Sequence, residues 1–125
     1  MIETPEVRLT IAFNDPNLDS EEQDKEALQL LSEMKGWDEV ESVKRVPDLN
    51  PPESNKTLGG FLVGLLTVEV TKENVKKLLG FLSDRLSGKT IELEVEANGK
   101  KLKVKASSQA ELAAAIQAAK EFVAT

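Results

Sequence analysis

Apolar and polar residues alternate along several stretches of the chain, which is the two-residue period of a half-buried β-strand. The first such stretch is residues 7–13, VRLTIAF. The second is residues 40–46, VESVKRV, which is rich in β-branched residues and stops at Pro47. Each stretch predicts one strand of a sheet that buries one face.

Residues 90–106, TIELEVEANGKKLKVKA, contain two alternating runs joined by Asn98-Gly99. This dipeptide is favoured in the type I′ turns of two-residue β-hairpins, so the segment predicts a hairpin with a fixed register. One face then pairs Glu92, Glu94 and Glu96 with Lys105, Lys103 and Lys101, and the other pairs Val95 with Leu102 and Leu93 with Val104. We expect a wet face of opposite charges and a dry aliphatic face.

Three further segments have apolar residues at the three-to-four-residue spacing of an amphipathic helix: 19–36, 71–88 and 107–125. Each starts at a residue suited to cap a helix, namely Asp19 or Ser20, Thr71, and Ser108, which lies three residues before Glu111 at capping-box spacing. The predicted apolar stripes are Ala27, Leu28, Leu31 and Met34; Val75, Leu78, Leu79, Leu82 and Leu86; and Leu112, Ile116, Ala119 and Val123.

A glycine-rich apolar run, TLGGFLVGLL, occupies residues 57–66. A helix would place its apolar residues on one face and Gly60 and Gly64 one turn apart on another, where a neighbouring element could pack closely against them. A buried strand over 61–70, FLVGLLTVEV, is the alternative, because periodicity does not separate the two for short apolar runs. We favour the helix, with both glycines as packing residues.

These elements predict a single domain over residues 1–125 with an α+β fold. We expect a four-stranded mixed sheet covered by helices, in the order β-α-β-α-α-β-β-α. A right-handed crossover through the first helix would set the first two strands parallel. The segment 47–56, with three prolines and no apolar period, predicts an exposed loop.

Composition narrows the function classes. The 125-residue chain is 40% apolar and 30% charged with a formal net charge of −6, which is typical of a soluble globular protein and argues against binding nucleic acid. It contains no Cys and no His, which removes thiolate chemistry, the commonest general base and the commonest transition-metal ligands. No signal peptide is visible, so we expect a cytoplasmic location.

Local motifs that imitate ligand sites have structural explanations. The run at 57–66 is shorter than the roughly 20 apolar residues of a membrane-spanning helix, and its glycines are followed by hydrocarbon rather than by a phosphate-binding helix start. Residues 15–26 place Asp15, Asn17, Asp19 and Glu26 at calcium-loop positions, but Ser20 replaces the glycine that makes the sharp turn. We therefore expect no metal, no cofactor and no catalytic residue.

The motifs LGGFLVGLL, KKLLGFLSDRL and IELEVEANGKKLKVKA give the chain a resemblance to the effector-associated constant component family of bacterial conflict systems. The resemblance covers most of the chain and rests on structural rather than catalytic motifs. It implies a small α+β adaptor that couples sensing to an effector, with a caspase-like or trypsin-like peptidase or a nucleotide-dependent switch ATPase as partner.

The sequence therefore predicts a non-enzymatic interaction module whose partner is a protein. Leu58, Gly60 and Gly64 are its candidate interaction surface, as an alternative to packing inside the domain. A small-ligand-binding regulatory domain is the second hypothesis, since an α+β sheet with covering helices can hold a pocket at its edge. A homo-oligomer is left open.

Overall fold

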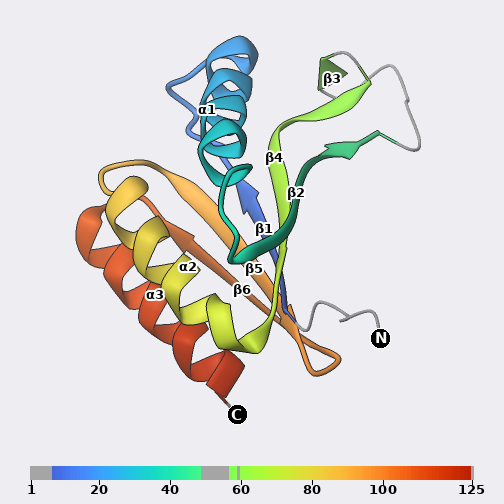
Figure 1. Cartoon of the computed structure of the whole chain (residues 1–125). Helices are drawn as coiled ribbons and strands as arrows, with labels where there is room; N and C mark the ends of the chain where they lie inside the picture. Colours follow the sequence, from blue (N-terminus) through green and yellow to red (C-terminus); the bar gives the residue numbers. More distant parts are fainter. Residues whose placement is uncertain (1–6, 49–56, 59, 125) are drawn as a thin grey trace.

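A computed structural model of the chain describes residues 7–48, 57–58 and 60–124 (Figure 1). Within these ranges the strands are β1 (Val7–Ala12), β2 (Val40–Pro47), β3 (Thr57–Leu58), β4 (Phe61–Val70), β5 (Ile91–Ala97) and β6 (Lys100–Ala106). The helices are α1 (Ser20–Met34), α2 (Lys72–Arg85) and α3 (Gln109–Ala124). Most of the loop expected at 47–56 lies outside the described residues.

The described strands form one sheet in the order β2-β4-β1-β5-β6, with the short β3 paired to the start of β4. Every neighbouring pair is antiparallel. The α+β class is confirmed, but the four-stranded mixed sheet and its element order are wrong. The difference arises because the glycine-rich run adds a strand to the sheet instead of a helix to its surface.

Strands β1 and β2 run in the same direction, but they do not pair because β4 lies between them. In the same way β4 and β5 run in one direction with β1 between them. Helices α1 and α2 therefore each connect two strands that enclose a third, which is the split βαβ connectivity of ferredoxin-like folds. The expected parallel direction of the first two strands is confirmed, but β4 lies between them, so the sheet is not mixed.

Strand β4 replaces the helix predicted over residues 58–66. Its residues Leu66, Val68 and Val70 are buried and alternate with part-exposed neighbours, which is strand periodicity. It has β1 on one side and β2 on the other. The first half of β4, FLVGLL, is almost entirely apolar, and a short run of this kind also fits helical spacing, so the pattern favoured the wrong alternative.

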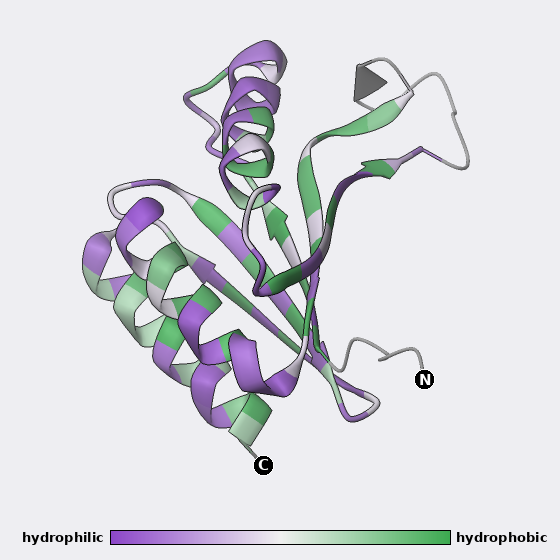
Figure 2. Ribbon diagram, viewed as in Figure 1, coloured by the Kyte–Doolittle hydropathy of each residue, from purple (hydrophilic) through white to green (hydrophobic). Residues whose placement is uncertain are grey.

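The described helices all cover the same face of the sheet (Figure 1). Helix α1 contacts β4 and β2, whereas α3 contacts β6, β5 and α2. Apolar side chains from every helix meet those of the central strands in one core, and Figure 2 shows the apolar residues along β4, α2 and α3. None of the described helices is long and apolar enough to span a lipid bilayer.

The apolar stripes of α2 and α3 are confirmed, since all of their predicted members are buried. The buried face of α1 is rotated about the helix axis relative to the predicted stripe. Leu28 is 43% exposed, and the buried residues are Asp24, Ala27, Leu30 and Met34. Asp24 also lies on the buried face of α1, where its carboxylate accepts hydrogen bonds from Arg45 of β2 and Gly64 of β4.

The hairpin register is confirmed at every predicted pair, from Glu92 opposite Lys105 to Glu96 opposite Lys101. Asn98 and Gly99 have φ angles of 55° and 74°, as a type I′ turn requires. Asp19 caps α1 in a capping box with Glu22. At α3, Ser108 Oγ accepts from the Glu111 N–H at 3.1 Å, but the Glu111 carboxylate accepts from the Ser107 N–H at 2.7 Å instead of from Ser108.

Candidate functional site

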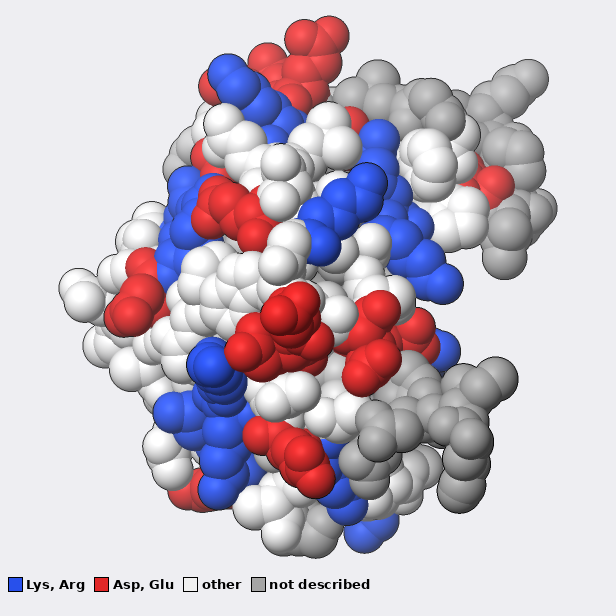
Figure 3. All heavy atoms as spheres, in the orientation of Figure 1, with Lys and Arg blue, Asp and Glu red and all other residues white. Residues whose placement is uncertain are grey.

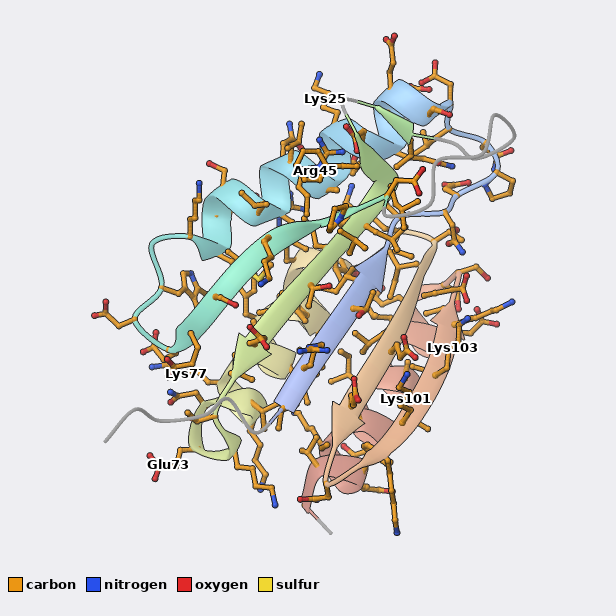
Figure 4. The ribbon with its side chains drawn as sticks, turned by 90° about the vertical axis from the view of Figure 1, so that its right-hand side faces the viewer. Lys25, Arg45, Glu73, Lys77, Lys101 and Lys103 are labelled. Atoms are coloured by element: carbon orange, nitrogen blue, oxygen red, sulfur yellow. The ribbon has the colours of Figure 1, made fainter. Side chains whose placement is uncertain are left out.

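The sheet has a second face that carries none of the described helices (Figure 4). Its side chains are those that alternate with the core residues along each strand, so the strand registers fix which residues are neighbours. From β2 to β6 they are Ser42 and Lys44; Leu65, Thr67 and Glu69; Ala12, Thr10 and Arg8; Glu92, Glu94 and Glu96; and Lys105, Lys103 and Lys101. We call this surface the open face.

The middle of the open face is uncharged. Thr10 lies opposite Thr67, and Ala12 lies opposite Leu65, on the adjacent strands β1 and β4. All four residues are part-exposed, and we call them the central patch. Charged side chains surround the patch on both sides, because β2 contributes Lys44 and β5 contributes its row of glutamates. An uncharged centre within a charged rim is the usual composition of a protein–protein interface.

Part of the rim is an ordered charge network around Glu69. Ser42 Oγ donates a hydrogen bond to Glu69 Oε1 at 2.8 Å, and Arg8 Nη2 lies 3.3 Å from Glu69 Oε2. Arg8 also reaches Glu96, with 3.9 Å between Nη1 and Oε1. The hydrogen bond from Ser42, together with the weaker hydrogen bond and the positive charge of Arg8, holds the pKa of Glu69 below its ordinary value, so this carboxylate stays charged at neutral pH.

Beside this network the open face is hollowed. A depression of about 240 Å³ lies among Arg8, Glu69, Glu96 and Asn98, where the hairpin turn meets the ends of β1 and β4. The hollow is bordered by both signs of charge. It gives the rim a shape as well as a charge pattern, and both features favour one orientation of a docked surface.

The opposite face of the sheet holds a buried ion pair at the start of β4. Asp24 is only 6% exposed, and its Oδ1 accepts hydrogen bonds from Arg45 Nη2 and, at 3.2 Å, from the Gly64 N–H. The Arg45 guanidinium lies 4.8 Å from the centre of the Phe61 ring. Arg45 Nε is buried without a hydrogen-bond partner among the described residues. Through its hydrogen bonds to Arg45 and Gly64, Asp24 joins α1, β2 and β4.

Gly64 makes this junction possible. Its φ of +70° is unfavourable for other residues, and a Cβ there would lie 2.8 Å from the Phe13 carbonyl oxygen. The Phe13 N–H donates to the Gly64 carbonyl oxygen at 2.8 Å, so the two backbones are in direct contact. The register between β2 and β4 shifts nearby, between Arg45 and Pro47. The predicted packing role is confirmed for Gly64, whose close neighbours are Phe13, just after β1, and Gln23 of helix α1.

The other two predicted site residues lie apart from Gly64. Gly60 is exposed at the turn between β3 and β4 with a φ of +83°, and a Cβ added to it would meet no heavy atom of the described residues within 4 Å. Its predicted packing role is therefore wrong, because the turn needs its backbone conformation rather than its small size. Leu58 pairs with Phe61 through the β3–β4 ladder. An interaction surface at Leu58 and Gly60 stays a prediction.

Sequence reasoning missed both the central patch and the Asp24–Arg45 pair. A signal for the pair was present, since Asp24 lies one helical turn before Ala27, on the stripe that packs against the sheet. The central patch had no such signal. It forms only because β4 lies beside β1, and that pairing depends on assigning β4 as a strand.

The carboxylates of residues 15–26 are directed to separate partners. Asp15 Oδ1 accepts from the Asn17 N–H at 2.9 Å, Asp19 caps α1, and Glu26 lies 2.9 Å from Lys89 Nζ. Over the ranges that the structure describes, no three Asp or Glu side chains converge as a metal site would require. The segment acts as the turn into α1.

Comparisons of the chain with family models, with curated proteins and with solved structures found no match. The resemblance to the effector-associated constant component family therefore stays a prediction from the sequence.

Proposed function

We propose that this protein is a non-catalytic interaction module that binds a protein partner through the open face. The observation that carries the proposal is the arrangement of the central patch, Thr10, Ala12, Leu65 and Thr67, inside a rim of both charges. Interface centres are depleted of charge and their rims are polar. The rim would select the partner and its orientation, and the patch would be the part that loses water on binding.

The titration behaviour of the described side chains supports a binding role over acid–base catalysis. The pKa values of Glu33, Glu39, Glu69 and Glu111 are lowered, and that of Arg85 is raised, in each case mainly by a hydrogen bond. These shifts move the groups away from neutral pH and fix their charges. A general acid or base needs the opposite, a pKa brought close to the working pH.

The resemblance in sequence suggests the class of partner. It would be a caspase-like or trypsin-like effector peptidase or a nucleotide-dependent switch ATPase of a bacterial conflict system, with this domain coupling sensing to the effector. Acidic and basic side chains are interspersed over the side of the molecule seen in Figure 3. Such mixed charge suits a partner of specific shape better than a uniformly charged polymer.

Site-directed photo-crosslinking in host cells tests the proposal. A photoreactive amino acid at position 67, in the central patch, should form a discrete adduct with one protein, which mass spectrometry then identifies. The matched control is position 117, an exposed residue of α3 on the other side of the molecule. Adducts from position 117 but not from position 67, or the same adducts from both, would refute a partner on the open face.

A further inference from the structure

Strand β6 is an edge of the sheet, and no described strand pairs with its outer side. The two-residue turn at Asn98-Gly99 determines which backbone groups point outward. In such a hairpin Ala97 and Lys100 exchange hydrogen bonds, so every second residue from Lys100 bonds to β5 and the residues between them point away. The outward N–H and C=O groups therefore belong to Lys101, Lys103 and Lys105.

The side chains of the same three residues form a basic row along this edge, as the strand register shows, and Figure 4 labels Lys101 and Lys103 there. All three are exposed, and Lys103, whose side chain is 65% exposed, lies 3.6 Å from Glu92 through its Nζ. Lys101 and Lys105 form no salt bridge with any residue that the structure describes. Along this edge, every second residue therefore offers both outward-pointing backbone N–H and C=O groups and a positively charged side chain.

The other side of the edge strand faces a hollow. A space of about 310 Å³ lies between β6 and α3, bordered by Val104, Lys105, Glu111, Ala114 and Ala115. Alanine side chains on α3 keep this space open, since they are too short to cover the strand edge. A segment lying along β6 would direct every second side chain into it.

We propose that β6 accepts an extended segment of a partner protein as an additional strand. The segment carries carboxylates at every second position, opposite Lys101, Lys103 and Lys105, and apolar side chains between them that enter the hollow beside α3. Strand β5 already shows this complement on the inner side of β6, where Glu92, Glu94 and Glu96 alternate with Leu93 and Val95. Strand addition of this kind draws affinity from the backbone and specificity from alternate side chains.

A second copy of this chain does not fit as the added strand through its own β6. Pairing β6 with β6 would set lysine opposite lysine along the whole edge, and like charges directly opposite are destabilising. Lysines on an edge strand also prevent nonspecific pairing in general. If the lysines only prevented pairing at the edge, no strand would bind there, whatever its charge. If they select a partner, a strand with alternating carboxylates would bind. An acidic strand therefore distinguishes the two explanations.

The probe is a capped peptide with the sequence of residues 91–97, IELEVEA, added to the full chain. The control peptide, IKLKVKA, has lysine at the three glutamate positions. The amides of Lys101, Lys103 and Lys105 should exchange rapidly with solvent in the free protein and slowly when IELEVEA is bound, as followed by NMR, whereas IKLKVKA should have no effect. No saturable binding up to millimolar peptide, or release of the β5 amides through strand displacement, would overturn the proposal.

Two variants at one position separate strand addition from simple charge attraction. Lys103→Pro removes an outward N–H that the β5–β6 ladder does not use, so the fold is retained and peptide binding is lost. Lys103→Ala removes one cross-strand charge pair and should weaken binding only about 1.5- to 5-fold. Equal losses in both variants would overturn strand addition. If circular dichroism shows that Lys103→Pro unfolds, the same comparison is made at Lys105, near the strand end.

This inference shares with the proposed function the premise that the partner is a protein, but it uses the β6 edge of the open face and not the central patch. Thr67→Arg, which blocks the central patch, should leave the affinity for IELEVEA unchanged. Loss of peptide binding in Thr67→Arg would place the peptide on the central patch and overturn the assignment to the edge. A peptide result in either direction leaves crosslinking from position 67 as an independent test of the central patch.

Discussion

Gly64 shows how one residue sets the geometry of a whole strand. Its positive φ and the close contact of its backbone with Phe13 let β4 change course beside α1, and its N–H supplies a hydrogen bond to the buried Asp24 carboxylate. Gly60 has a similar φ but has open space around it. A substitution at Gly60 therefore measures the cost of a positive φ alone, whereas one at Gly64 also measures the cost of steric overlap.

Gly64→Ala should destabilise the protein by more than Gly60→Ala. A positive φ costs a non-glycine residue about 1–2 kcal/mol at either position, and overpacking at Gly64 adds about 1–3 kcal/mol because the new Cβ meets backbone. Urea denaturation of the two single variants measures the difference. Equal midpoints would show that the Phe13 contact relaxes without cost, and would contradict the packing role of Gly64.

The contribution of Glu69, on the rim of the open face, to folding stability depends on pH. Its folded pKa is lowered, chiefly by the Ser42 hydrogen bond, so its contribution to stability is complete above the ordinary value of 4.5 and is lost as the pH falls through the lowered pKa. Ser42→Ala should reduce stability at neutral pH, and the two proteins should converge in acid. A difference that is constant across the acid range, measured by urea denaturation at several pH values, would show that Ser42 does not act through Glu69.

Among the elements, the hairpin and the Asp19 cap of α1 were predictable because each is encoded by residues close together in sequence, whereas Thr71 begins α2 without a side-chain cap hydrogen bond. Asn98-Gly99 defines its own register, and Asp19 finds its capping partner three residues away. Strand β4 was not predictable in this way. Its identity depends on pairing with β1, about 60 residues earlier in the chain, as in the pair Leu9 and Val68, and a local pattern does not contain that information.

The same contrast between local and long-range determinants explains which parts of the candidate site could be predicted from the sequence. Glutamates 92–96 and the lysines opposite them were placed correctly from the sequence, because they belong to the hairpin. The central patch combines β1 with β4, and the Asp24–Arg45 pair combines α1 with β2, so both required the tertiary arrangement.

Gly99→Val tests the hairpin as an element. The φ of Gly99 is +74°, and a β-branched residue resists this conformation, so the variant should lose about 1–2 kcal/mol of stability. Lys100→Val, one residue later at a strand position, is the control and should have little effect because valine favours strands. Thermal unfolding distinguishes the two variants, and similar melting temperatures would mean that the turn tolerates a negative φ at residue 99.

At the scale of the whole molecule, the described helices lie on one side of the sheet and the open face lies on the other. Antiparallel sheets often leave one face in water, so exposure alone does not indicate a function. What distinguishes this face is the position of its charges, which avoid the central patch and gather on the strands around it. None of the described helices covers the central patch, and its four residues are part-exposed.

The most direct test of this account is the affinity of the purified partner, identified by crosslinking, for two arginine variants. Thr67→Arg places a long charged side chain in the central patch, whereas Gln117→Arg places the same side chain on the exposed surface of α3. If the patch is the centre of the interface, Thr67→Arg should weaken binding by about 30-fold or more, and Gln117→Arg should leave it unchanged. Unchanged affinity in a folded Thr67→Arg variant would contradict the claim that the open face is the binding surface.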